Sequence, residues 1–178
     1  MSLIIVVLLG LTLIYSLSAL KFEKQNAKIR VGMDRKDYDR VLRIAENTPQ
    51  FFRNLDPEFM PISSYTGFIY FTRNNFKKAK EEYEKSLKVH PTNIYALRSL
   101  AVMHLRMGNT EKGKELLDKA LSIVPTFASA LENLSVYYEK QGDLEKSYET
   151  LKKIRKQDRS EKIKKRMEYL ESRINNKN

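Results

Sequence analysis

The sequence has no cysteine and no tryptophan, and it has only two histidines, His90 and His104. Without cysteine the chain can form no disulfide bond, no thiolate zinc site and no cysteine-linked lipid anchor. Two histidines alone give a transition metal few ligands. The sequence also lacks a phosphate-binding loop of the GxxxxGK[ST] type. It therefore predicts no catalytic residues, no metal site and no cofactor, and we expect a protein that is not an enzyme.

Charge is absent from residues 1–20, which read MSLIIVVLLGLTLIYSLSAL. An apolar helix of roughly 20 residues matches the ~30 Å hydrocarbon core of a bilayer. The alternative is a cleaved secretory signal, which has a basic start and a shorter apolar core. Because this start has no Lys or Arg and the run is long, the pattern favours an uncleaved single-pass transmembrane anchor over 1–20.

Basic residues follow the apolar run directly, at Lys21, Lys24, Lys28 and Arg30. The more basic flank of a membrane helix usually stays in the cytoplasm. We therefore expect residues 21–33 to form a juxtamembrane linker and the rest of the chain to be cytoplasmic. A signal-anchor that carries the domain across the membrane, to the periplasmic side, is the alternative.

Proline is scarce, yet three of the five prolines share one spacing, since 125 − 91 = 34 and 91 − 57 = 34. A fixed period in this range indicates an internal repeat. Other columns hold the same period, and each row predicts a helix, a turn with a left-handed residue and a second helix. The turn column holds Asn74, Gly108 and Gly142, and two small-residue columns hold Gly67, Ala101 and Ser135, then Ala79, Gly113 and Ser147.

These columns resemble the tetratricopeptide repeat (TPR), with rows at 60–93, 94–127 and 128–159. The chain departs from the pattern at the first-helix tryptophan, replaced by Ser63, Leu97 and Leu131, and at Arg159, where a proline is usual. The resemblance implies an all-α solenoid of helix hairpins that follows the transmembrane helix. It also implies that binding, and no chemistry, is the activity.

Both flanks of the repeats are expected to be helical. Residues 34–59 form a degenerate repeat with helices at 34–47 and 50–56, because Pro49 interrupts the second helix. Residues 160–178 form a basic capping helix and tail, with apolar positions four, three and four apart that cover the end of the solenoid. Those positions are Ile163, Met167, Leu170 and Ile174.

The resemblance places the first helix of each hairpin on a concave groove. Aromatic and arginine side chains there are typical of peptide-binding hot spots. The alternative is that these side chains only pack within the domain. A chaperone-tail receptor is not expected, since Val102 replaces the asparagine of that clamp. The predicted partner-binding residues are Phe68, Phe71, Tyr95, Arg98, Val102, Arg106, Asn133 and Val136.

The chain carries a net charge of +11, and residues 152–166 hold nine basic residues against Asp158 and Glu161. This stretch is a candidate contact for anionic lipid headgroups, or an ordinary solvated cap. Nucleic acid is not an expected partner, because no recognisable RNA-binding module is present.

The sequence as a whole predicts a membrane-anchored TPR adaptor or scaffold that holds protein partners in its groove. This layout is similar to bacterial inner-membrane repeat proteins, and mitochondrial import receptors share it; the bacterial inner membrane is favoured. The alternative is a fixed structural subunit of a larger membrane complex.

Overall fold

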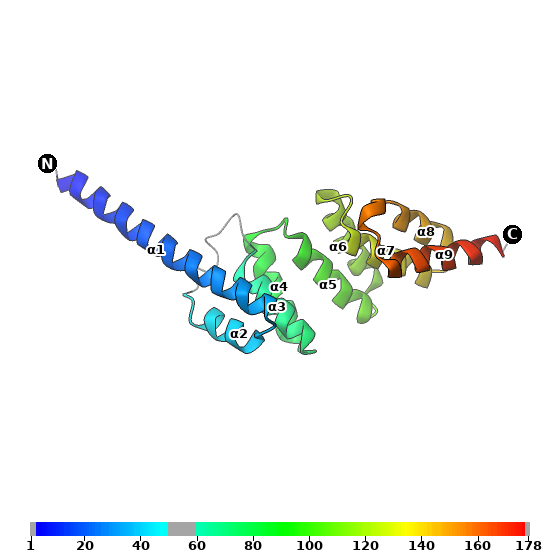
Figure 1. The fold of residues 1–178 in the computed structure, drawn as a ribbon, viewed down its shortest axis with the longest axis horizontal. Helices are drawn as coiled ribbons and strands as arrows, with labels where there is room; N and C mark the ends of the chain where they lie inside the picture. Colours follow the sequence, from blue (N-terminus) through cyan, green and yellow to red (C-terminus); the bar gives the residue numbers. More distant parts are fainter. Residues whose placement is uncertain (1–2, 50–59, 177–178) are drawn as a thin grey trace.

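The computed structural model describes residues 3–49 and 60–176, and this part of the chain is helical without a strand. The all-α fold class is confirmed. Figure 1 shows an elongated stack, with the free end of α1 at one end and α9 at the other. The helices are α1 (Leu3–Asp34), α2 (Tyr38–Glu46), α3 (Ile62–Thr72), α4 (Phe76–Val89), α5 (Ile94–Arg106), α6 (Thr110–Ile123), α7 (Ala128–Lys140), α8 (Leu144–Lys152) and α9 (Glu161–Asn175).

Three hairpins, α3–α4, α5–α6 and α7–α8, form the repeats. Their turns contain Asn74, Gly108 and Gly142, with φ of 58°, 82° and 81°. Only glycine enters this left-handed region freely, and asparagine tolerates it. The turn column read from the sequence is therefore the column in which the chain reverses.

The small residues lie where the two helices of a hairpin approach most closely. A Cβ added at Gly67 would lie 2.9 Å from Cδ1 of Tyr83, and one added at Gly113 would lie 2.6 Å from Cγ of Leu105. Burial raises the pKa of the Tyr83 phenol, so this side chain stays neutral at physiological pH. Large side chains thus fill the spaces that the small columns leave.

A fourth hairpin precedes these three, where the sequence predicted a linker. Residues 21–33 are helical and continue α1 without a break. Phe22 and Ile29 of this stretch are buried in one cluster with Val41 and Ala45 of α2. The linker assignment was therefore wrong: this half of α1 is the first helix of a hairpin, and α2 is the second.

The degenerate repeat differs from its prediction in register. Its turn residue is Lys36, with φ of 56°, so the spacing to the next turn is 74 − 36 = 38 residues, not 34. The helix expected at 34–47 is shorter and spans Tyr38–Glu46. The helix expected at 50–56, together with Pro57, lies outside the described residues.

At the C-terminal end, Arg159 ends helix α8 in place of the proline that the repeat pattern has there. Its side chain donates hydrogen bonds to the carbonyl oxygens of Ile154 at 2.9 Å and Lys152 at 2.8 Å. After a short 3-10 turn (Lys156–Asp158), α9 buries Ile163 and Leu170 in one cluster with residues of α7 and α8. The predicted capping helix is confirmed.

Asn93 joins three helices of neighbouring repeats. Its Oδ1 accepts hydrogen bonds from the backbone N–H groups of Tyr95 and Ala96, both at 3.1 Å, which caps α5. Its Nδ2 donates to Oγ of Ser64 on α3 at 2.8 Å and Oγ of Ser86 on α4 at 3.0 Å. The residue therefore fixes the start of α5 against the preceding hairpin.

The other half of α1 projects from the domain. Leu13 and Leu17 are 61% and 58% exposed, and the most apolar stretch has a mean hydropathy of 2.0. By length and composition this helix can cross a membrane, although an N-terminal signal sequence passes the same test.

Candidate protein-interaction surface

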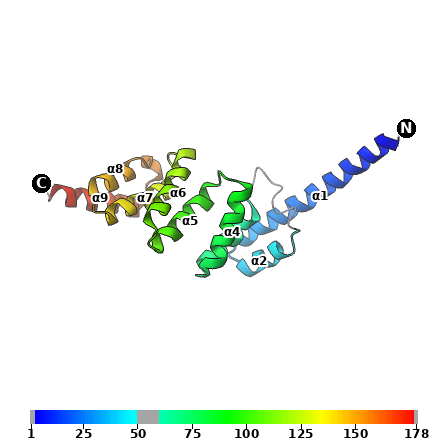
Figure 2. The same ribbon diagram turned by 180° about the vertical axis from the view of Figure 1, so that it is seen from behind.

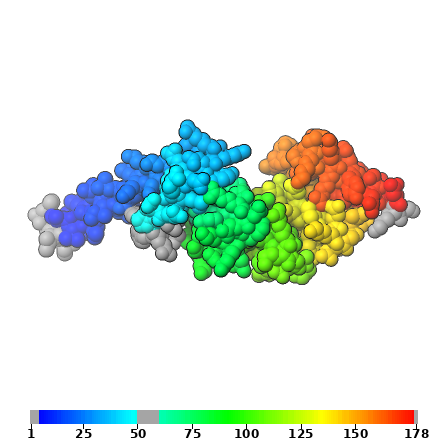
Figure 3. Space-filling view, turned by 90° about the horizontal axis from the view of Figure 1, so that it is seen from below, coloured from blue at the N-terminus to red at the C-terminus, as the bar shows by residue number. Residues whose placement is uncertain are grey.

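Each first helix presents a stripe of residues spaced four apart, which lie on one face of a helix. The stripe is Ser64, Phe68 and Thr72 on α3, Arg98, Val102 and Arg106 on α5, and Glu132, Val136 and Lys140 on α7. The second helices α4, α6 and α8 lie in front in the view from behind (Figure 2). We call the surface formed by the three stripes the groove, and Figure 3 shows the molecule hollowed between the α1–α2 hairpin and its C-terminal segment.

Aromatic side chains form the α3 end of the groove. Phe68 is 41% exposed and meets the edge of Tyr38 of α2, with ring centroids 6.3 Å apart. Phe71 is half-buried and packs against Phe76, with ring centroids 5.7 Å apart. The guanidinium of Arg106 lies 5.2 Å from the Phe71 ring centroid, which joins α5 to this cluster.

The remaining predicted residues lie along α5 and α7. Tyr95, at the start of α5, is 55% exposed and has its ring 5.5 Å from that of Phe127. Val102 and Asn133 are half-buried, and the amide of Asn133 donates to the Ser129 carbonyl at 2.6 Å. Val136 lines an open pocket of about 480 Å³ with Glu139, Lys140 and Arg166. Their role in binding stays a prediction.

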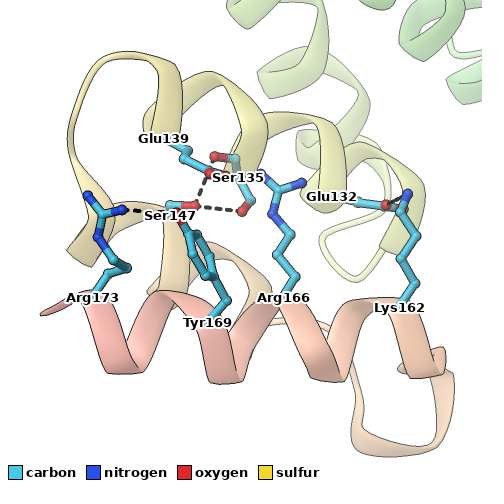
Figure 4. A network of polar contacts seen from close by, with 8 residues as sticks. All are labelled: Glu132, Ser135, Glu139, Ser147, Lys162, Arg166, Tyr169 and Arg173. Carbon is cyan, nitrogen blue, oxygen red and sulfur yellow. Dashed lines mark hydrogen bonds and ion pairs between the residues drawn. The ribbon is translucent and has the colours of Figure 1, made fainter. Parts of the chain in front are cut away.

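Sequence reasoning missed the contribution of α9 to this surface. Lys162 forms an ion pair with Glu132 at 2.5 Å, and Arg166 forms one with Glu139. Figure 4 shows these side chains reaching from α9 toward α7. Glu132 of the α7 stripe and Glu139 beside it are thereby neutralised. The signal was available, because α9 begins 161 − 128 = 33 residues after α7 and so takes the place of another first helix.

Two arginine side chains near the groove have unused hydrogen-bonding capacity. The Nε atoms of Arg98 and Arg166 are buried without a hydrogen-bond partner in the described part of the chain. Within residues 3–49 and 60–176, no group of three or more His, Asp or Glu side chains is placed to hold a metal ion. The surface offers contacts for binding, with aromatic, aliphatic and cationic groups.

Comparison with known proteins agrees with this architecture. The sequence profile of the tetratricopeptide repeat matches residues 67–93, whereas no curated protein matches the chain. MamA from Desulfovibrio magneticus superposes with a TM-score of 0.67 at 19% identity, covering 87% of this chain and 86% of that one. A tetratricopeptide repeat protein from Parabacteroides merdae superposes with a TM-score of 0.63 at 19% identity, covering 87% and 60%.

The fold is that of a helical-repeat scaffold for protein interactions, a class that is generally non-catalytic. One repeat, at residues 67–93, matches the tetratricopeptide repeat profile, and the fold is similar to that of tetratricopeptide repeat proteins.

Proposed function

We propose that this protein is a single-pass, membrane-anchored scaffold that recruits protein partners into its groove and has no chemistry of its own. The observation that carries the proposal is α1, whose apolar half is exposed and whose other half is built into the first hairpin. A bilayer around the apolar half removes its exposed side chains from water. The repeats then present the groove beside the membrane.

The packing after residue 20 supports an anchor over a cleaved leader. Phe22 and Asn26 are buried immediately beyond the apolar run, and the helix is unbroken there. Proteolysis concentrates at exposed, irregular backbone. The backbone next to the apolar run is regular and packed, which fits a helix that is retained in the mature protein.

We place the groove on the cytoplasmic side, with the bacterial inner membrane as the favoured location. Lys21, Lys24 and Lys28 are exposed directly after the apolar half of α1, which favours retention of that side. The periplasmic side is the alternative.

Residues 152–166 are a poor candidate for lipid contact, although the sequence suggested them. Six of the nine basic side chains already have partners within the chain; they are Lys152, Arg155, Arg159, Lys162, Lys164 and Arg166. This segment also lies toward the end of the molecule opposite the free end of α1 (Figure 1). We therefore leave lipid contact there out of the proposal.

The test combines membrane fractionation with photocrosslinking. A photoreactive amino acid replaces Val102 in the full chain, and a second variant carries it at Lys119, on the exposed face of α6, as control. We expect the protein in the membrane fraction, protease-protected on sealed vesicles of one orientation, and several substoichiometric partners crosslinked from Val102 but not from Lys119.

Two outcomes would contradict the proposal. A soluble protein that starts after residue 20 would mean that α1 is a cleaved leader. One stoichiometric partner crosslinked from Val102 would favour the fixed structural subunit of a larger complex.

A further inference from the structure

The charge that is free to act in the groove is positive. Glu132 and Glu139 are already paired with Lys162 and Arg166. Arg98, Arg106 and Lys140 form no ion pair with any described residue. On α5 the two arginines lie one turn before and one turn after Val102, so cations flank an apolar centre on both sides. An occupant that brings acidic groups to these positions is complementary in charge.

The apolar centres of the three stripes set a second requirement. Phe68, Val102 and Val136 are each 34 residues apart and lie at the middle of their stripes. α3 contacts α5, and α5 contacts α7, so these helix axes are about 8–10 Å apart. A polyproline-type segment advances about 3.1 Å per residue and repeats its side-chain direction every third residue, after about 9 Å. That spacing is comparable to the distance between the axes of adjacent packed helices.

We propose that the groove takes an extended, polyproline-like protein segment that carries an apolar side chain at every third position and acidic side chains between them. The apolar side chains contact Phe68, Val102 and Val136, and the carboxylates pair with Arg98, Arg106 and Lys140. This inference rests on the proposed function of the groove and names the class of partner.

The α9 helix sets the sign of this preference. Because Lys162 and Arg166 neutralise Glu132 and Glu139, the α7 side of the groove does not repel an acidic segment. Without these pairs the same surface would present two carboxylates to the occupant. A helix that closes the solenoid thus also adjusts what the groove accepts.

The test uses fluorescence anisotropy with the full chain in nanodiscs of zwitterionic phosphatidylcholine. The probe is a labelled peptide of about twelve residues made of Leu-Glu-Pro units, which favour this extended conformation. One comparison peptide replaces Glu by Lys, and another keeps the composition but places Leu at every second position. We expect the first peptide to bind and both comparison peptides to bind roughly tenfold more weakly or worse.

Protein variants separate specific recognition from general attraction. Arg106→Glu combined with Lys140→Glu changes two exposed side chains. We expect this variant to bind the Glu peptide roughly tenfold more weakly or worse, and to prefer the Lys peptide. Lys119→Glu on α6 is the matched control, and circular dichroism checks that each variant is folded. Equal binding of all peptides, or an equal loss in the control, would overturn the inference.

Failure of this inference is distinguishable from failure of the proposed function. If none of the peptides binds while partners are still crosslinked from Val102, the scaffold stands and the assigned partner class is wrong. If crosslinking from Val102 also finds no partner, the groove itself is not the binding surface.

Discussion

At the scale of single residues, the first hairpin, α1–α2, packs large side chains where the later hairpins have small ones, and small side chains where they have large ones. The column that holds Gly67, Ala101 and Ser135 holds Ile29 there, and its large counterpart is Ala45 instead of Tyr83, Leu117 and Leu151. Gly32 likewise faces Val41, and an added Cβ would lie 2.6 Å from Val41 Cγ2. Complementary volume is therefore kept while each position changes its residue type.

Gly32→Ala tests this exchange. We expect destabilisation of about 1–3 kcal/mol from overpacking, set against a gain of about 1 kcal/mol in helix propensity. Hydrogen exchange of the α1–α2 hairpin in the full chain in detergent micelles would measure the loss. Adding Val41→Ala should recover part of it. Gly10→Ala is the control, since nothing lies within 4 Å of its added Cβ; equal behaviour of Gly32→Ala and the control would refute the exchange.

Asn93→Ala should lower the free energy of unfolding by more than the loss of an ordinary helix cap does. It removes the side-chain acceptor of the backbone N–H groups of Tyr95 and Ala96, and the two hydrogen bonds that Asn93 donates to Ser64 and Ser86. Cap removal alone costs about 0.5–2 kcal/mol. Asn109 occupies the same position before α6 but makes no capping side-chain hydrogen bond. Urea unfolding of the two alanine variants compares them, and a loss for Asn109→Ala as large as for Asn93→Ala would contradict this account.

These residues also show what the sequence could and could not predict. The three repeats from residue 60 onward were predictable, because glycine or asparagine at the turns and small residues at the crossings recur every 34 positions. The first hairpin was not, since its turn residue is Lys36 and its spacing to the next turn is 38 residues. Its exchanged side-chain sizes also cancel the column pattern, although the packing they produce is equivalent.

At the scale of elements, the end of α8 depends on a side chain where the repeat pattern has a proline. A proline stops a helix by removing a backbone donor, whereas Arg159 stops it by occupying the carbonyl oxygens of Lys152 and Ile154. The chain can then turn through 156–158 and place α9 against α8. The position of α9 is thus a consequence of one long-range side chain.

Arg159→Ala should loosen this junction. We expect faster hydrogen exchange at the end of α8 and the start of α9, because two carbonyl groups lose a charged donor, a contribution of about 1.5–3 kcal/mol per bond when buried and less here. Arg155→Ala is the control, since among the described residues Arg155 forms its ion pair with the nearby Asp158. Unchanged exchange in Arg159→Ala would show that packing of Ile163 and Leu170 alone holds α9.

The candidate site, too, was predictable from the sequence only in part. That Phe68, Val102 and Val136 share a face followed from counting along the sequence. That Glu132 and Glu139 are already occupied did not follow, because it depends on how α9 is rotated about its axis when Ile163 and Leu170 are buried. The spacing of 33 residues places α9 in line with the first helices, but packing decides which of its side chains reach Glu132 and Glu139, and a single sequence does not specify that packing.

At the scale of the whole molecule, one helix links the exposed apolar segment to the repeats. α1 runs for 32 residues from the apolar end into the first hairpin, so no loop separates the proposed anchor from the repeats, and we expect the two to move as one body. Because the chain lacks cysteine, spin labels can be attached at Tyr15→Cys and Tyr169→Cys. Pulsed electron paramagnetic resonance in nanodiscs should show a narrow distribution of distances between the two labels.

Inserting Gly-Ser-Gly-Ser between Leu20 and Lys21 should broaden that distribution, because the insert interrupts the helical hydrogen bonds with a flexible segment. The same four residues appended after Asn178 should leave it narrow. A broad distribution in the protein without the insert would mean that α1 bends between its two halves.

The binding site of a scaffold that has no flexible linker to its membrane anchor can reach only a small volume around that anchor. When both partners are confined to one membrane, the effective concentration of one at the other depends on the linkers between membrane and binding site. In the anchored scaffold that we propose, that linker is a helix of fixed length, about 1.5 Å per residue, so the groove would stay at one height above the bilayer. The reach needed for an encounter would then come from the partner, whose docking segment would have to sit on a linker long enough to arrive at that height.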